Sequence, residues 1–230
     1  MTVAAPAAVA LAFVLEAAVA EPPTRIHPVA WLGKMVAPFD REWSHPHAVG
    51  VSVAVVLPVF AAAVGGGLVL AAALVDPLTG AVVAGVALFT TTSLRMLLGE
   101  ARAVVAATGD DLDAARERLK SLAGRDASDL SAGEVRSAAV ESAAENLADG
   151  IVAPLAAFAL GSVVSLPVAA AAAAWVKGVN TLDSMLGYRD KRVGTASARL
   201  DDAVMWVPAR LSAVLLAAAA LDARSLARAR

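Results

Sequence analysis

Residues 141–176 read ESAAENLADGIVAPLAAFALGSVVSLPVAAAAAAWV, and this stretch decides how the chain is arranged. It opens with three carboxylates, Glu141, Glu145 and Asp149, which are spaced four residues apart and would share one helix face. It then turns apolar for about the length of a membrane crossing. Like charges at this spacing destabilise a bare helix. On an ordinary helix they would indicate a solvated face, but beside so long an apolar run they indicate a binding site.

The composition of the whole chain indicates a membrane protein. Hydrophobic residues make up 59% of its 230 residues, and the mean hydropathy is +0.69, which is well above that of soluble domains. A short apolar run at 211–221 is about half as long as a spanning helix and is not counted as a crossing. The longer apolar runs lie at roughly 3–20, 49–75, 80–98 and 151–176. We therefore predict an all-α, polytopic integral membrane protein that forms a single domain, residues 1–230.

Charge and cysteine content exclude several classes of protein. The net charge of −2 gives no basis for nucleic-acid binding, and the absence of cysteine excludes disulfides and thiolate metal sites. The first apolar run has no Lys or Arg before it and contains Glu16, so it is predicted to be a retained helix rather than a signal peptide. Whether the chain forms a homo-oligomer stays open.

Breaks in the apolar runs predict where the helices bend or end. Pro58 and the glycines at 65–67 predict a kink or break within 49–75. The sequence DPLTG at 76–80 predicts a tight turn. The polar residues at 90–93 and Arg95 are expected to face protein, because an arginine that faces lipid is costly.

Residues 99–150 read as a helical insertion that lies outside the membrane on the cytoplasmic side. A helix is expected at 110–122, where apolar residues recur at helical spacing. A second helix is expected at 132–149, with Ser131 as its N-cap, Glu134 completing a capping box, and Gly150 ending it.

The basic residues predict that 151–176 doubles back. Six Lys or Arg fall in 99–150 and another six in 177–210, so both regions belong on the cytoplasmic side. One crossing between them would separate the two regions. Gly161, Ser162 and Pro167 interrupt the apolar run, so we predict a re-entrant hairpin with two short arms. The polar motifs then converge on one face of the membrane.

Acidic and basic side chains of these motifs are the candidate site residues. Oxygen ligands beside phosphates suit Mg²⁺, and Glu145, Asp149 and Asp183 are the candidate metal ligands. We assign candidate catalytic roles to Asp201, Asp202 and Glu141 from residue type, the two aspartates as proton acceptors. The candidate ligands of substrate or phosphate are Arg25, His27, Asn146, Lys177, Asn180 and Arg210. The chain has no P-loop, GxGxxG, HExxH or GxSxG motif, so those enzyme classes are excluded.

Six motifs, taken in order, resemble those of the CobD/CbiB family, the adenosylcobinamide-phosphate synthases of cobalamin biosynthesis. The motifs are HPVAWLG at 27–33, LRMLLGEARAV at 94–104, GRD at 124–126, ESAAENLADGIVAPL at 141–155, KGVNTLDSMLGYRD at 177–190, and ARLDD with PARL at 198–211. The resemblance implies a multi-pass protein of the cell membrane with its active face in the cytoplasm. It also implies amide ligation of (R)-1-aminopropan-2-ol, or its O-phosphate, to the propionate of adenosylcobyric acid, with ATP as co-substrate and Mg²⁺ as cofactor.

Two departures from the family pattern keep other functions open. Met205 stands where the family usually carries Asn, and the chain stops before the family's C-terminal tail motif. An inactive, truncated relative is therefore one alternative. A corrinoid transport component is another. A CDP-alcohol phosphotransferase is strongly discounted, because NLADGIVAP at 146–154 lacks the first Asp and the Arg of that motif.

Overall fold

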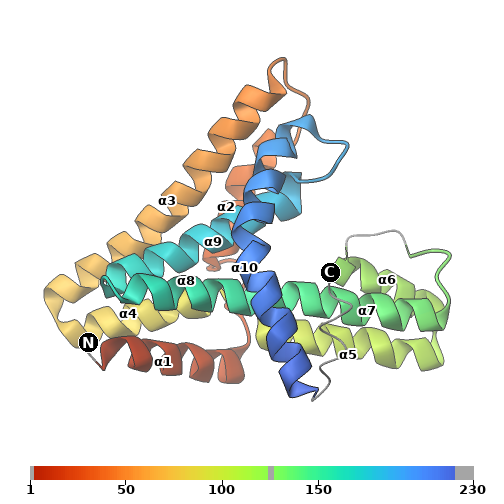
Figure 1. The fold of residues 1–230 in the computed structure, drawn as a ribbon, viewed down its shortest axis with the longest axis horizontal. Coiled ribbons are helices and arrows are strands. Elements are labelled where there is room, and N and C mark those ends of the chain that lie inside the picture. Colours follow the sequence, from red (N-terminus) through yellow and green to blue (C-terminus); the bar gives the residue numbers. More distant parts are fainter. Residues whose placement is uncertain (1–2, 124–126, 221–230) are drawn as a thin grey trace.

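The computed structural model describes residues 3–123 and 127–220 (Figure 1). Within these ranges all the long regular elements are helices, joined by short turns. The helices are α1 Ala4–Val19, α2 Pro28–Val36, α3 Pro46–Val75, α4 Pro77–Phe89, α5 Leu94–Asp110, α6 Leu112–Ala123, α7 Ala132–Leu147, α8 Ala153–Ser162, α9 Leu166–Leu186 and α10 Thr195–Ala219. The GRD motif at 124–126 lies outside the described residues.

The prediction of an all-α polytopic membrane protein is confirmed, but the segments differ from those expected. Among the described residues, four helical stretches are long and apolar enough to cross a membrane: Pro46–Val75, Pro77–Asp110, Ala132–Ser162 and Arg192–Ala219. The first apolar run forms only the 16-residue α1, shorter than the roughly 20 residues that a crossing needs. The run that begins at 211 is instead the end of the 25-residue α10, because the polar RLDD segment before it is also helical.

The segment 151–176 doubles back as predicted, as a helical hairpin, whereas its re-entry from one face of the membrane stays a prediction. Helices α8 and α9 are joined by a turn at 163–165, and the side chain of Ser165 accepts a hydrogen bond from the backbone N–H of Val168 at the start of α9. Gly161 allows the two helices to meet closely, since a Cβ there would lie 2.7 Å from the Cα of Ala169. Helix α9 continues to Leu186, ten residues beyond the predicted end of the second arm.

The expectation that Gly150 ends the preceding helix is wrong. Residues Ala148–Val152 form a π-helical turn that joins α7 to α8, so the chain stays helical from Ala132 to Ser162. Gly150 is buried in this turn, where a Cβ would lie 2.7 Å from the Ser93 hydroxyl oxygen. The glycine therefore allows a close approach between elements.

The expected break in α3 is also absent, because its glycines serve helix packing. Helix α3 runs unbroken over 30 residues and packs along α9. A Cβ on Gly66 would lie 2.9 Å from both the Cβ of Ala171 and the carbonyl oxygen of Pro167, whereas a Cβ on Gly67 would meet nothing within 4 Å. Small residues of this kind let membrane helices approach closely.

Two buried polar groups join α1 to the break between α4 and α5. Glu16 is 4% exposed, and its Oε1 accepts a hydrogen bond of 2.8 Å from the backbone N–H of Arg95. The guanidinium of Arg95 donates in turn to the carbonyl of Ala17, at 2.7 Å. Thr92 is also buried and donates to Glu16. The expectation that these polar residues face protein is confirmed for Thr91 and Thr92, which are buried, but Arg95 is exposed. The two charged side chains nevertheless bond to backbone groups at helix ends.

Helices α5, α6 and α7 form a three-helix unit with a core of its own, built around Val104, Leu119 and Val135. The predicted capping box at the start of α7 is present, since Ser131 accepts from the N–H of Glu134 and its own N–H donates to the Glu134 carboxylate. Figure 1 shows this unit at one end of the molecule, with the start of α1 and the turns α3–α4 and α8–α9 at the other. Its cytoplasmic location stays a prediction.

Candidate functional site

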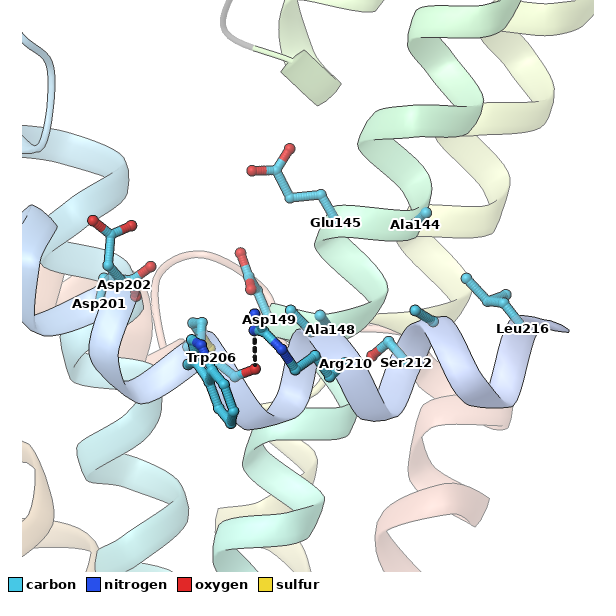
Figure 2. Close-up of a pocket in the computed structure, with 13 residues that line it drawn as sticks. Ala144, Glu145, Ala148, Asp149, Asp201, Asp202, Trp206, Arg210, Ser212 and Leu216 are labelled. Atoms are coloured by element: carbon cyan, nitrogen blue, oxygen red, sulfur yellow. Dashed lines mark hydrogen bonds between the residues drawn. The ribbon is translucent and has the colours of Figure 1, made fainter. Parts of the chain in front are cut away.

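A cavity of about 480 Å³ lies where α10 crosses the π-helical turn after α7 (Figure 2). Helix α10 supplies one wall, and the end of α7 with the π-helical turn supplies the other. The lining residues are Ala144, Glu145, Ala148, Asp149, Asp201, Asp202, Met205, Trp206, Ala209, Arg210, Ser212, Ala213 and Leu216. Four carboxylates that the sequence singled out therefore share one cavity, although they come from two segments more than fifty residues apart.

Negative charge accumulates at one end of this cavity. Asp201 interacts electrostatically with Asp183, Asp149, Asp202 and Glu145, and all four interactions are repulsive. Asp201 is 9% exposed, and its Oδ1 accepts no hydrogen bond from the part of the chain that the structure describes. A buried oxygen without a partner is costly. The arrangement therefore favours a bound cation or hydrogen-bond donor.

The π-helical turn places Asp149 beside α9. Asn180 donates a hydrogen bond of 3.1 Å from Nδ2 to Asp149 Oδ2. This bond closes the base of the α8–α9 hairpin, because the two residues lie on its two arms. The bond therefore brings the returning helix α9 beside the start of the hairpin. Turns of this type are frequently found at functional sites.

Two cations belong to this region. Lys177 on α9 interacts electrostatically with both Asp149 and Glu21. Arg210 lies on the cavity wall, with its guanidinium carbon 3.8 Å from the centre of the Trp206 ring, and it donates to the Trp206 carbonyl at 2.9 Å. The close-up in Figure 2 shows this pair on α10. Of the two predicted phosphate ligands, Lys177 interacts with a cavity carboxylate, and Arg210 lines the same cavity as the carboxylates.

The loop between α1 and α2 reaches Lys177 from the other side. His27 caps α2, since its Nδ1 accepts from the N–H of Val29 at 3.2 Å, and its Nε2 lies 3.9 Å from the Glu21 carboxylate. Burial lowers the pKa of His27, and the charge of Lys177 lowers it further. Burial raises the pKa of Glu21, against the opposing effect of Lys177. Both shifts favour the uncharged forms of the two side chains and so weaken an ion pair between them.

Three predicted site residues lie elsewhere. Glu141 is exposed on α7 and does not line the cavity. The amide of Asn146 donates to the carbonyl oxygens of Ser142 and Leu122, so it ties α7 to α6. Arg25 is exposed, and its carbonyl accepts from the indole of Trp31. The structure gives Asn146 a role in packing.

Sequence reasoning missed three residues of this region. Glu21 partners Lys177, Trp206 holds Arg210, and Ser212 has a buried hydroxyl with no partner among the described residues. Trp206 precedes Arg210 by four residues, and on a helix this spacing alone predicts contact. Glu21 and Ser212 carried no comparable signal, because their partners or surroundings come from distant segments. Met205, already noted as a departure from the family, is buried against the same cavity.

The carboxylates provide a suitable donor set for Mg²⁺. Within residues 3–123 and 127–220, no three His, Asp or Glu side chains lie close enough together to hold a metal ion by themselves. Mg²⁺, however, is usually bound by one or two carboxylates with water and substrate phosphates completing its shell. The unpartnered Asp201 oxygen and the mutual repulsion of the cluster also favour a cation. The residues therefore fit this metal with one or two protein ligands.

Comparison with known proteins agrees with the motifs. The family model described as CobD/CbiB protein matches residues 9–230. A cobalamin biosynthesis protein CobD from Geobacter metallireducens is 38% identical, with 93% of this chain and 68% of that protein covered. A protein of the same name from Klebsiella pneumoniae is 37% identical, over 93% of this chain and 68% of the relative. The chain thus spans about two thirds of these relatives. No solved structure matches it. From the family match and the motifs together, the chain belongs to the CobD/CbiB family.

Proposed function

We propose that this chain acts in cobalamin biosynthesis as an ATP-dependent ligase, which joins 1-aminopropan-2-ol or its O-phosphate to the propionate of adenosylcobyric acid. The observation that carries the proposal is the convergence, in a CobD/CbiB chain, of carboxylates from α7, the π-helical turn and α10 with Arg210 around one cavity. Lys177 interacts with one of these carboxylates, Asp149, from α9. The active face is proposed to lie on the cytoplasmic side, where ATP is available.

The chemistry needs activation, because a carboxylate and an amine do not condense in water unaided. In the proposed reaction a propionate oxygen attacks the terminal phosphoryl group of ATP, which releases ADP and leaves an acyl phosphate. The amine then attacks the acyl carbon, phosphate departs, and one proton is lost from nitrogen. Mg²⁺, when bound, would offset the charge of the transferred phosphoryl group. Its protein ligands would be drawn from Glu145, Asp149 and Asp183.

The chain's own residues supply position and charge. Lys177 and Arg210 would hold phosphate oxygens, since cations stabilise the charge of a phosphoryl group in transfer. Asn180 holds the carboxylate of Asp149 in one orientation. Asp201 or Asp202 would accept the proton from the attacking amine. Glu141 stays a candidate only for an indirect role, because it lies outside the cavity lining.

A ligase assay tests the proposal. Purified chain is given adenosylcobyric acid, the amine and Mg·ATP, and amide product is followed by mass spectrometry. We expect ATP-dependent product that falls at least about tenfold in Glu145→Ala, while the exposed Glu117→Ala on α6 serves as the matched control. The same yield from Glu145→Ala as from the control, or product without ATP, would contradict the proposal.

The alternatives predict different results in the same preparation. No amide product, but passage of corrinoid across chain-containing vesicles, would indicate transport. No product and no transport would indicate an inactive relative. In that case Met205→Asn is the informative variant, because this buried side chain faces the cavity and an amide there restores two donors and an acceptor. Activity gained by Met205→Asn would mark the chain as a weakened ligase.

A further inference from the structure

Pro154 removes one helical hydrogen bond from the π-helical turn that carries Asp149. In an α-helix the carbonyl of Gly150 would accept from the N–H of residue 154, but proline has no N–H and its ring clashes with that carbonyl. The N–H of Ala153 instead reaches back five residues, to the carbonyl of Ala148. Pro154 therefore favours the π-helical turn and leaves the Gly150 carbonyl without its α-helical donor.

The junction between α4 and α5 supplies a replacement donor. The backbone N–H of Ser93 donates to the Gly150 carbonyl at 3.3 Å. A Cβ on Gly150 would lie 2.7 Å from the Ser93 hydroxyl oxygen, so only glycine lets the two segments come this close without a shift. Ser93 is the N-cap of α5, but its side chain makes no capping hydrogen bond. The contact thus depends on the backbone N–H of Ser93 and not on its hydroxyl.

The junction is itself held in place from α1. Thr92 and Arg95 lie on either side of Ser93, and both bond to the buried carboxylate of Glu16. The Thr92 hydroxyl donates to this carboxylate at 3.3 Å, and the backbone N–H of Arg95 donates at 2.8 Å. A donor between two anchored neighbours has little freedom to move. Ser93 therefore presents its N–H to the π-helical turn from a fixed position.

We propose that the α4–α5 junction and the π-helical turn form a positioning device for Asp149, with Ser93 as the positioning residue. Pro154 favours the extra residue in the turn, Gly150 admits the junction, and the N–H of Ser93 holds the turn in that form. The consequence for catalysis rests on the proposed function, in which Asp149 is a candidate Mg²⁺ ligand. The positioning itself does not depend on that function.

The extra residue decides which way the cavity carboxylates point. Glu145 and Asp149 both line the cavity, and Figure 2 shows them projecting to the same side of the helix. Successive residues of an α-helix point about 100° apart, so an α-helical turn at this place would rotate α7 by about that angle relative to α8. The hairpin with α9 holds α8. Both carboxylates would therefore turn away from α10, and Asp149 would lose the amide of Asn180.

Spin-label distances in the full chain test the inference without nucleotide, corrinoid or Mg²⁺. The chain has no cysteine, so cysteines introduced at the exposed Val140 on α7 and Val207 on α10 are the only labelled positions. Pro154→Ala restores the N–H that the Gly150 carbonyl lacks, and we expect pulsed EPR in nanodiscs to show a shifted distance between the labels. Pro58→Ala makes the same change in the buried interior of α3 and should leave the distance as in wild type. An unchanged distance in Pro154→Ala would overturn the inference.

A pair of substitutions tests the contact between the turn and the junction. Gly150→Ala places a methyl group against the Ser93 hydroxyl oxygen, and we expect it to shift the same label distance and to lower kcat/KM of the ligase reaction about tenfold. Adding Ser93→Ala removes that oxygen but keeps the backbone N–H, so the double variant should recover most of the distance and of the activity. A double variant as impaired as Gly150→Ala would contradict the contact.

Kinetics distinguish positioning from a general loss of structure. When Asp149 is misdirected, Gly150→Ala should raise the Mg²⁺ concentration for half-maximal rate about tenfold, with little change in KM for the amine. A merely structural role would lower the Tm and the amount of active protein without changing either constant, and that result would overturn the inference. The expected distance shifts without amide product from any form of the chain would count against the proposed function alone. Product formation with unchanged distances in all variants would count against this inference alone.

Discussion

Asn180 donates a hydrogen bond of 3.1 Å to Asp149 and thereby joins the two arms of the α8–α9 hairpin at its base. Asp149 belongs to the π-helical turn and lines the cavity, whereas Asn180 lies on the returning helix. A bond between residues 31 positions apart in sequence therefore fixes the direction of a cavity carboxylate. The hairpin and the site depend on the same contact.

Removing the amide of Asn180 should disturb the site more than the fold. A hydrogen bond to a charged group contributes about 1.5–3 kcal/mol, so we expect Asn180→Ala to lower kcat/KM of the ligase reaction about 10- to 100-fold. The control is Ser184→Ala on the next turn of α9, whose exposed hydroxyl bonds only to the backbone of its own helix. A kcat/KM within twofold of wild type for Asn180→Ala would show that Asp149 needs no such support.

Adjacent glycines of α3 should respond oppositely to the same substitution. Gly66→Ala places a methyl group against Ala171 and the backbone of α9, and overpacking of this kind costs about 1–3 kcal/mol. Gly67→Ala meets open space and should be neutral or stabilising by up to about 1 kcal/mol. Thermal unfolding in detergent should show a lower Tm for the first variant only. A lower Tm in both would mean that α3 needs glycine for flexibility instead.

The buried carboxylate of Glu16 should contribute to stability through the backbone of α5. Glu16→Ala leaves the N–H of Arg95 and the hydroxyl of Thr92 without this acceptor, and an unmet buried donor costs about 1–3 kcal/mol. We expect a clear fall in Tm for Glu16→Ala and a smaller one for Glu16→Gln, which retains an acceptor oxygen. The exposed Val14→Ala is the matched control on the same helix. Equal Tm values for Glu16→Ala and the control would refute this role.

Acid should destabilise the chain partly through His27. Its pKa is lowered in the folded protein, so between that lowered value and the ordinary value of about 6.5 the unfolded chain binds more protons. His27 therefore contributes to the stability of the folded chain above about pH 6.5. This contribution is lost as the pH falls from about 6.5 to the lowered pKa of the folded protein. His27→Gln should flatten the dependence of Tm on pH between 7 and 5, and the exposed His47→Gln should leave it unchanged. The same slope in His27→Gln and wild type would exclude the histidine.

Local features of the fold followed from the sequence because local interactions decide them. The capping box at Ser131 and Glu134 needs only residues three apart, and the interruption at 161–167 needs only a loss of helix-forming sequence. The doubling back of 151–176 was predictable from the placement of Lys and Arg. Glycine was the weak signal, since the same residue can break a helix or let one approach another. In α3 and at Gly150 it serves close approach, and only the neighbouring helix reveals that.

The sequence by itself determined that this is an all-α, multi-pass membrane protein of the CobD/CbiB family, and that acidic and basic residues flank its apolar segments. Only the tertiary structure decided which of them meet. It brought Glu145, Asp149, Asp201 and Asp202 to one cavity, and it used Asn146 to join two helices. The physical reason is that a helix face can be read from spacing, whereas the crossing of α10 over the π-helical turn depends on packing between segments far apart in the chain.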